Sequence, residues 1–201
     1  MFVLNYNKTY FLNSFSKIND INIQDGIEIA FVGYSNSGKS SAINALTNKK
    51  NLARFSKMPG RTQLINFFQV NSEFRIVDLP GYGYATAPEI VKLKWQKILY
   101  HYLEKRDFLK GIILLMDIRY PLKKLDYKIL DLVKKRKIFF LVLLTKSDKM
   151  TLSQQNHQFK IVQNELNNFI HDIPVVLFSS IRKTGINILK NTLNLWHNSF
   201  L

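Results

Sequence analysis

Cysteine is missing from all 201 residues of the chain. A disulfide framework, a thiolate nucleophile and a cysteine-ligated metal centre are therefore excluded. The four histidines are scattered and show no spacing that is typical of metal ligands. Long hydrophobic runs are also missing, because the most apolar strings, residues 111–116 and 138–144, have only the length of buried strands. We therefore expect neither cysteine chemistry nor a membrane-spanning helix.

A targeting segment is not recognisable at the N-terminus. Residues 1–15 are apolar in patches, but asparagine and lysine interrupt them before the core of a signal peptide can form. We therefore expect a cytoplasmic protein without a membrane partner.

Acidic residues are few, because 14 Asp and Glu face 29 Lys and Arg, which gives a net charge of +15. A field of this sign concentrates polyanions such as RNA near the surface. Compositional drift is the alternative, since the chain is rich in Lys, Asn, Ile and Phe together. The charge favours an RNA-linked function and leaves drift open.

The pattern of apolar residues predicts one α/β domain. Six ranges predict strands: residues 27–32, 66–70, 74–79, 111–116, 138–144 and 175–178. Most of these runs are continuously apolar and are separated by helical patterns, which is typical of a parallel sheet covered on both faces. The second and third ranges form a hairpin, which places one antiparallel strand at the sheet edge. We predict a doubly wound, mostly parallel sheet of about six strands over residues 25–201, after a lead segment of residues 1–24.

A phosphate-binding loop follows the first predicted strand. Its residues, Gly33-Tyr34-Ser35-Asn36-Ser37-Gly38-Lys39-Ser40, match G-x-x-x-x-G-K-[ST] at every fixed position, and a helical stretch follows. In that context the backbone amides around Gly38 to Ser41 point at phosphates. Lys39 supplies a positive charge to the β and γ oxygens, and the Ser40 hydroxyl is a suitable Mg²⁺ ligand.

Two later segments complete the predicted phosphate site. Asp78-Leu79-Pro80-Gly81 ends an apolar strand, so that Asp78 can hold Mg²⁺ through water and the Gly81 amide can reach the γ-phosphate. The polar stretch Gly60-Arg61-Thr62-Gln63-Leu64 lies between the two motifs, and the Thr62 hydroxyl can complete the metal shell when a γ-phosphate is present. We predict Lys39, Thr62 and Gly81 as the residues that act on the γ-phosphate, and Ser40, Thr62 and Asp78 as the metal site.

Thr145-Lys146-Ser147-Asp148 follows a buried strand and predicts guanine recognition. The Asp148 carboxylate can accept from N1–H and the exocyclic amine of guanine, a donor pair that adenine lacks. The Lys146 stem can lie over the purine, and Phe178-Ser179-Ser180 can offer a backbone amide to guanine O6. Thr145 is a departure, since this motif usually begins with Asn.

These segments resemble the translation-factor-like GTPases and, more closely, the EngB (YihA/YsxC) family of ribosome-biogenesis GTPases. The resemblance is carried by GYSNSGKSSAINAL (33–46), MPGRTQLINFF (58–68), DLPGYGYA (78–85), TKSDKM (145–150) and FSS followed by KTG (178–185). It implies that a threonine at position 145, in place of the Asn found in other GTPases, is usual in this family. It also implies a role in assembling the large ribosomal subunit, and thereby in normal growth and cell division. The implied partners are GTP or GDP and the subunit precursor. We expect the protein to be a monomer.

The residue after Gly81 is Tyr82, where Ras-like enzymes have a glutamine that orients the attacking water. We therefore expect weak intrinsic hydrolysis that depends on a partner or a monovalent cation. Asn36 is a candidate K⁺ ligand by resemblance to potassium-stimulated GTPases, and an Asn that makes local loop hydrogen bonds is an equal alternative. Arg61 could supply charge in cis, although such an arginine is more often solvated or RNA-facing.

Two other functions stay open. A tRNA-modification or signalling GTPase would share the nucleotide site but not the ribosomal partner. A basic RNA-binding scaffold would keep the nucleotide as a structural element. Three basic clusters could face RNA: Arg54, Lys57 and Arg61; Lys92, Lys94 and Lys97; and Lys134, Lys135, Arg136 and Lys137, of which we expect the last to be a solvated face at the amino edge of the sheet.

Overall fold

A computed structural model describes residues 2–53, 64–83 and 88–201 of the chain. These residues contain seven strands: β1 (Tyr10–Phe15), β2 (Ile27–Gly33), β3 (Ile65–Gln69), β4 (Phe74–Asp78), β5 (Leu109–Asp117), β6 (Phe139–Thr145) and β7 (Val175–Leu177). They also contain five α-helices: α1 (Lys39–Thr47), α2 (Glu89–Lys105), α3 (Lys124–Arg136), α4 (Leu152–Phe169) and α5 (Ile186–Asn198). Short 3-10 helices are η1 (Tyr6–Lys8), η2 (Ile18–Asp20) and η3 (Ser147–Lys149).

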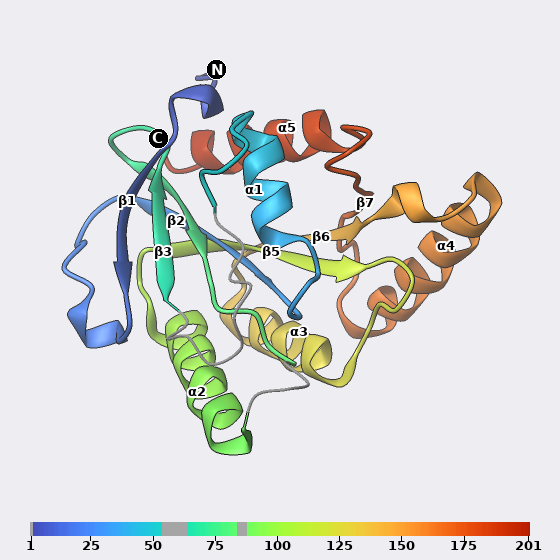
Figure 1. The fold of residues 1–201 in the computed structure, drawn as a ribbon, viewed down its shortest axis with the longest axis horizontal. Helices are drawn as coiled ribbons and strands as arrows, with labels where there is room; N and C mark the ends of the chain where they lie inside the picture. Colours follow the sequence, from blue (N-terminus) through green and yellow to red (C-terminus); the bar gives the residue numbers. More distant parts are fainter. Residues whose placement is uncertain (1, 54–63, 84–87) are drawn as a thin grey trace.

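The strands form one sheet in the order β1-β3-β4-β2-β5-β6-β7, with helices on both faces (Figure 1). Strand β3 is antiparallel to both of its neighbours, and the other strand pairs are parallel. The predicted doubly wound, mostly parallel α/β fold is therefore confirmed. After β2 the chain forms β3 and β4 on one side of β2 within the sheet. It then returns to form β5 on the other side of β2. The crevice at the carboxyl ends of these two strands is where ligands bind in such folds.

The structure differs from the predicted sheet at one edge. The sequence predicts about six strands with the antiparallel strand outermost, whereas β1 pairs with β3 and makes β3 internal. Most β1 side chains are exposed, and a register shift lies between Phe11 and Asn13, so neither an apolar run nor a clean alternation marks this strand. The division at residue 24 stays a prediction, although β1 lies in the lead segment and joins the sheet of the main domain.

Two hydrophobic cores cover the two faces of the sheet. Helices α2, α3 and α4 pack on one face through buried side chains that include Tyr102, Ile129 and Val162. Helices α1 and α5 pack on the other face through residues such as Ile43 and Leu193, and the two ends of the chain meet beside α5 (Figure 1). Within the described ranges, none of the helices has the length and apolar character needed to cross a membrane.

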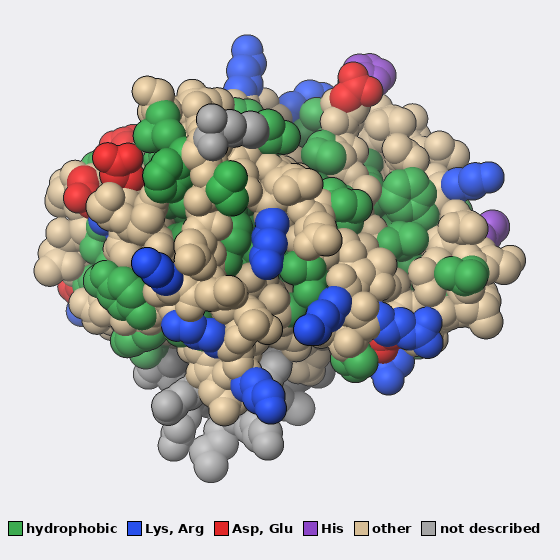
Figure 2. Space-filling view, turned by 90° about the horizontal axis from the view of Figure 1, so that it is seen from above, with side chains coloured by type: hydrophobic (Ala, Val, Ile, Leu, Met, Phe, Trp, Pro, Cys, Tyr) green, Lys and Arg blue, Asp and Glu red, His purple; other side chains and the backbone are tan. Residues whose placement is uncertain are grey.

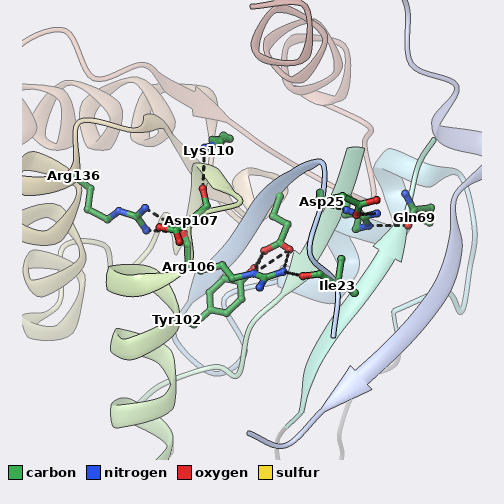
Figure 3. A network of polar contacts seen from close by, with 10 residues as sticks. Ile23, Asp25, Gln69, Tyr102, Arg106, Asp107, Lys110 and Arg136 are labelled. Carbon is green, nitrogen blue, oxygen red and sulfur yellow. Dashed lines mark hydrogen bonds and ion pairs between the residues drawn. The ribbon is translucent and has the colours of Figure 1, made fainter. Parts of the chain in front are cut away.

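One buried charge interrupts the apolar strand β2. Glu28 is completely buried, and its carboxylate accepts hydrogen bonds from the Tyr102 hydroxyl and pairs with Arg106 at 2.5 Å (Figure 3). A buried carboxylate is tolerated only when it is paired and hydrogen-bonded. The contact therefore fixes the end of α2 to the amino edge of the sheet.

Arg136 of the third basic cluster lies at the same edge. Its guanidinium donates to the backbone oxygen of Leu103 at 2.8 Å and to that of Arg106 at 3.1 Å, and Figure 3 shows the second contact. Carbonyls in the last turn of a helix, such as that of Leu103, have no partner within the helix, and a basic side chain can satisfy them. Arg136 is therefore a structural residue, in agreement with the predicted position of this cluster at the amino edge.

Candidate nucleotide-binding site

The phosphate-loop sequence connects the carboxyl end of β2 to the first turn of α1. Its bends require special backbone geometry. Gly38 has a φ of 96°, and a Cβ on Gly33 would lie 2.4 Å from the Leu115 carbonyl oxygen, so no side chain fits there. Asn36 has a φ of 63°, which asparagine tolerates better than most residues. The loop thus wraps the N-terminus of α1, where the amides and the helix dipole attract anions.

Lys39 begins helix α1, and Ser40 and Ser41 follow in its first turn. The Lys39 ammonium donates to the backbone oxygens of Gly33 and Tyr34, at 3.2 and 3.4 Å. Burial lowers the pKa of Lys39, and the nearby Asp78 carboxylate opposes this shift. The ammonium is thus held at the centre of its own loop, in the position from which it could contact phosphate oxygens.

The Asp78-Leu79-Pro80-Gly81 segment lies beside this loop. Asp78 is the last residue of β4 and is in register with Phe31 of β2, and the Leu79 amide donates to the Phe31 oxygen at 3.2 Å. All four residues of the segment are buried. Burial raises the pKa of Asp78 to about 6, and Lys39 opposes the shift. The two motifs therefore bring a lysine and a buried carboxylate close enough to interact electrostatically.

The residues present fit a magnesium ion that a nucleotide would bring. Oδ1 of Asp78 is buried without a hydrogen-bond partner, which marks an oxygen available for a cation or its water. The Ser40 hydroxyl supplies a second hard oxygen of the kind that Mg²⁺ prefers. No three His, Asp or Glu side chains of the described ranges gather into a metal site of their own. The ion would thus also need oxygens from phosphate groups or from water.

Tyr82 has a partner that the sequence does not reveal. Its side chain is buried in the core, and its hydroxyl donates to Oδ1 of Asp126 on α3 at 2.7 Å. The ring packs edge-on against Tyr34, with 4.7 Å between centroids. Acidic residues are common in the first turn of a helix, so nothing in the sequence distinguishes Asp126 as a partner of Tyr82.

The predicted base motif begins at the carboxyl end of β6, and Asp148 lies within η3. The Asp148 side chain is 9% exposed, and Oδ1 accepts a hydrogen bond from the Ser179 hydroxyl at 2.6 Å. Phe178 and Ser179 are buried directly after β7, and the Phe178 oxygen accepts from the Ser147 amide. The Ser179 amide donates to Thr184, which leaves the Ser180 amide as the candidate donor to guanine O6.

Lys146 is held in place by a residue of β5. Its ammonium lies 3.0 Å from Oδ2 of Asp117, and Arg119 pairs with the same carboxylate at 2.6 Å. Burial acts to raise the pKa of Asp117, but the hydrogen bonds and charges of Arg119 and Lys146 outweigh it and lower the pKa to about 2. The carboxylate is therefore ionised at neutral pH and fixes the end of the Lys146 side chain at the rim of the site.

Thr145 joins the base motif to the phosphate loop. Its hydroxyl lies 2.6 Å from the Ser37 oxygen and 3.1 Å from the Met116 oxygen, and its Cβ is 3.6 Å from the position of a Cβ on Gly38. A hydroxyl at residue 145 thus makes a buried hydrogen bond between the two halves of the site. Although Thr145 replaces the usual Asn, the base motif therefore keeps a hydrogen bond to the phosphate loop.

Removal of this hydroxyl gives the first test of the site. We expect Thr145→Val to weaken GDP binding by roughly tenfold, because a buried carbonyl then loses its partner, which costs about 1–3 kcal/mol. Thr145→Ser keeps the hydroxyl and should stay within about twofold of the unchanged protein. Titration of a fluorescent GDP analogue measures both. Equal weakening by the two substitutions would show that the methyl group, and not the hydroxyl, matters.

Several predicted residues lie outside the described ranges: Gly60, Arg61, Thr62 and Gln63, together with Arg54 and Lys57 of the first basic cluster. Their predicted roles as switch, metal and RNA-facing residues stay predictions. Leu64 is described, is 37% exposed and directly precedes β3.

Comparison with known proteins agrees with this geometry. The family described as "50S ribosome-binding GTPase" matches residues 28–146. A protein named "Probable GTP-binding protein EngB" from Buchnera aphidicola subsp. Schizaphis graminum is 60% identical over 200 residues, which cover 100% of both chains. A protein of the same name from Mannheimia succiniciproducens is 50% identical over 100% of this chain and 98% of its own.

Two solved structures are also similar. A crystal structure of a probable GTP-binding protein engB has a TM-score of 0.69 at 21% identity, over 86% of this chain and 99% of that one. The G domain of the T. maritima FeoB iron transporter has a TM-score of 0.54 at 28% identity, over 85% of this chain and 98% of that one. The first likeness supports the fold alone, because its sequence identity is low.

Proposed function

The chain belongs to the EngB family of GTP-binding proteins, and on this premise we propose that it is a slow, Mg²⁺-dependent GTP switch. In this proposal the GTP-bound protein engages precursors of the large ribosomal subunit and leaves them after hydrolysis. The protein would act in the cytoplasm as a monomer and would support growth and cell division through ribosome assembly.

The hydrogen bond from Thr145 to the Ser37 oxygen is the observation that carries the nucleotide assignment. It holds the predicted guanine motif and the predicted phosphate loop at one edge of the sheet, although they are 108 residues apart. Asp148 supplies the carboxylate that distinguishes guanine from adenine, and Lys39 supplies the charge for the phosphates. A single nucleotide spanning the two motifs explains both sets of residues.

Mg²⁺ would be held by the Ser40 hydroxyl and, through water, by Asp78. When bound, the ion offsets negative charge on the phosphate oxygens. The chain's own residues have separate tasks: Lys39 and the amides of α1 orient the phosphates, and the Gly81 amide donates to the terminal one. Thr62 is proposed as a further ligand in the GTP state.

Slow hydrolysis is supported by the position of Tyr82. Its hydroxyl donates to Asp126 inside the core, so it is not directed at a water beside a terminal phosphate. Unassisted enzymes of the Ras type turn over on the order of 10⁻³ per second or slower. We propose that a partner, or K⁺ at the exposed Asn36, supplies the missing charge.

The ribosomal partner is supported by the family description and by charge. The matched family is described as ribosome-binding, and the net charge of +15 favours contact with RNA. On the face shown in Figure 2, Lys and Arg side chains stand mostly apart among hydrophobic and uncharged ones. That face offers no single basic patch. Within the described ranges, the proposed RNA contacts are Lys92, Lys94 and Lys97 on α2, the helix that follows the Asp78–Gly81 segment, and Lys94 and Lys97 are exposed.

Cosedimentation with large-subunit precursors tests the proposal. We expect the protein to travel with the particles when loaded with a non-hydrolysable GTP analogue, and to be largely free when loaded with GDP. High salt should weaken the association, because phosphate contacts release counterions. Equal association in both nucleotide states would contradict a switch. If Lys39→Ala spares both association and cell growth, the scaffold function is favoured instead.

A further inference from the structure

A buried hydrogen bond ties the turn after Asp78 to helix α3. Tyr82 is 4% exposed and Asp126 is 1% exposed, and the Tyr82 hydroxyl donates to Oδ1 of Asp126 at 2.7 Å. The other oxygen, Oδ2, accepts from the Lys123 amide at 2.9 Å. Both oxygens of Asp126 are therefore used, and the carboxylate is fixed at the start of α3.

Backbone hydrogen bonds join the same turn to the phosphate loop. The Ser35 amide donates to the Tyr82 oxygen at 2.7 Å, and the Tyr82 amide donates to the Gly33 oxygen at 3.4 Å. The Tyr34 ring packs on Tyr82, and the Tyr34 hydroxyl accepts from the Leu125 amide of α3 at 3.2 Å. The phosphate loop, the turn and α3 thus form one connected unit.

The result is that Gly81 lies directly against Lys39. A Cβ on Gly81 would be 2.8 Å from the Lys39 ammonium and 3.2 Å from the Ser35 amide nitrogen. The Lys39 ammonium meanwhile donates to the carbonyls of Gly33 and Tyr34. A terminal phosphate that contacts both Lys39 and the Gly81 amide would lie between them, and in the proposal that follows it displaces the turn and not only the Lys39 side chain.

We propose that Tyr82 and Asp126 are a positioning pair that sets the relative affinity of the site for GDP and GTP. The pair stabilises the turn against Lys39. GDP has no terminal phosphate to displace the turn, whereas GTP binding must strain or break the Tyr82–Asp126 contact. This inference rests on the proposed guanine-nucleotide site and adds the residues that bias it toward the diphosphate.

The test compares dissociation constants for GDP and for a non-hydrolysable GTP analogue. We expect Tyr82→Phe, which keeps the ring and removes the hydrogen bond, to lower the ratio of the GTP to the GDP dissociation constant by roughly three- to tenfold. The GDP value should stay within about twofold, because a diphosphate leaves the turn in place. A ratio that is unchanged or higher overturns the proposal.

Tyr102→Phe is the matched control. It removes another buried tyrosine-to-carboxylate hydrogen bond, to Glu28 at the opposite edge of the sheet. It should lower thermal stability and leave the ratio unchanged, and an equal fall of the ratio in both variants overturns the proposal. Asp126→Ala is the second variant, since it removes both accepted hydrogen bonds and leaves no side-chain partner for the Tyr82 hydroxyl. It should lower the ratio in the same direction, and it decides the matter if Tyr82→Phe does not fold.

The outcomes also separate this inference from the proposed function. If the unchanged protein binds neither nucleotide, the guanine-nucleotide site itself fails. If it binds both and the ratio is the same in all variants, only the positioning role fails.

Discussion

Asp148→Asn is expected to lower GDP affinity by a factor of about a hundred or more, since a site built for a donor pair discriminates strongly when the pair is mismatched. The Asp148 side chain is 9% exposed; its Oδ1 accepts from Ser179, and its Oδ2, which lies 3.9 Å from the Lys149 ammonium, is the oxygen left for the donors of a base in the proposed site. An asparagine can still accept the hydrogen bond of Ser179, and the local fold should therefore persist. The amide nitrogen of the asparagine is a hydrogen-bond donor, and it would face the two donors of guanine without forming a hydrogen bond.

The same substitution should create a preference for xanthine nucleotides. Xanthine carries a carbonyl in place of the exocyclic amine of guanine, and an asparagine amide can donate to that oxygen. Competition between labelled GDP and xanthosine diphosphate measures the change. Asp131→Asn removes the same charge from an exposed position on α3 and should leave GDP affinity within about twofold. Unchanged base preference in Asp148→Asn would contradict the assignment of the base motif.

Ser40→Ala is expected to weaken GDP binding by a factor of about ten or more when Mg²⁺ is present, because the proposed metal site then loses its serine oxygen. In EDTA the loss should be within about twofold, since the hydroxyl then has no metal to bind. The orphaned Oδ1 of Asp78 belongs to the same proposed shell, so Asp78→Asn should show the same dependence on the metal. Fluorescent nucleotide release, measured in both buffers, gives the comparison.

Ser153→Ala provides the control for Ser40→Ala. Ser153 occupies the second position of α4 and is exposed. Ser40 occupies the second position of α1, so both substitutions change a serine in the first turn of a helix. Ser153→Ala should leave nucleotide binding unaltered in either buffer. Equal loss with and without metal in Ser40→Ala would mean that the hydroxyl supports the loop and not the ion.

Much of the fold could be predicted because local patterns agreed with the tertiary structure. The six predicted strands all occur, and most of them are continuous apolar runs of the kind typical of buried parallel strands. The phosphate loop lies between β2 and α1 because its glycines allow backbone geometry that side chains prevent. Strand β1 escaped prediction, since its stability comes from pairing with β3 and not from its own exposed residues.

The contacts that connect the motifs could not be predicted in the same way. The Thr145–Ser37, Lys146–Asp117 and Tyr82–Asp126 contacts join residues that are distant in sequence. Each pair depends on the order of strands in the sheet and on the side of the sheet to which a helix packs. The residue types alone permit many partners, so these connections emerge only from the three-dimensional structure.

Competition for labelled GDP by unlabelled GDP, GTP and ATP on the unchanged protein in Mg²⁺ is the most direct test of the account. The account predicts that GDP and GTP both compete at low concentrations, GDP at the lower one, whereas ATP needs a concentration about a hundredfold higher than GDP, because adenine cannot satisfy Asp148. Displacement by ATP at the same concentration as GDP would contradict a guanine-specific site and the switch built on it.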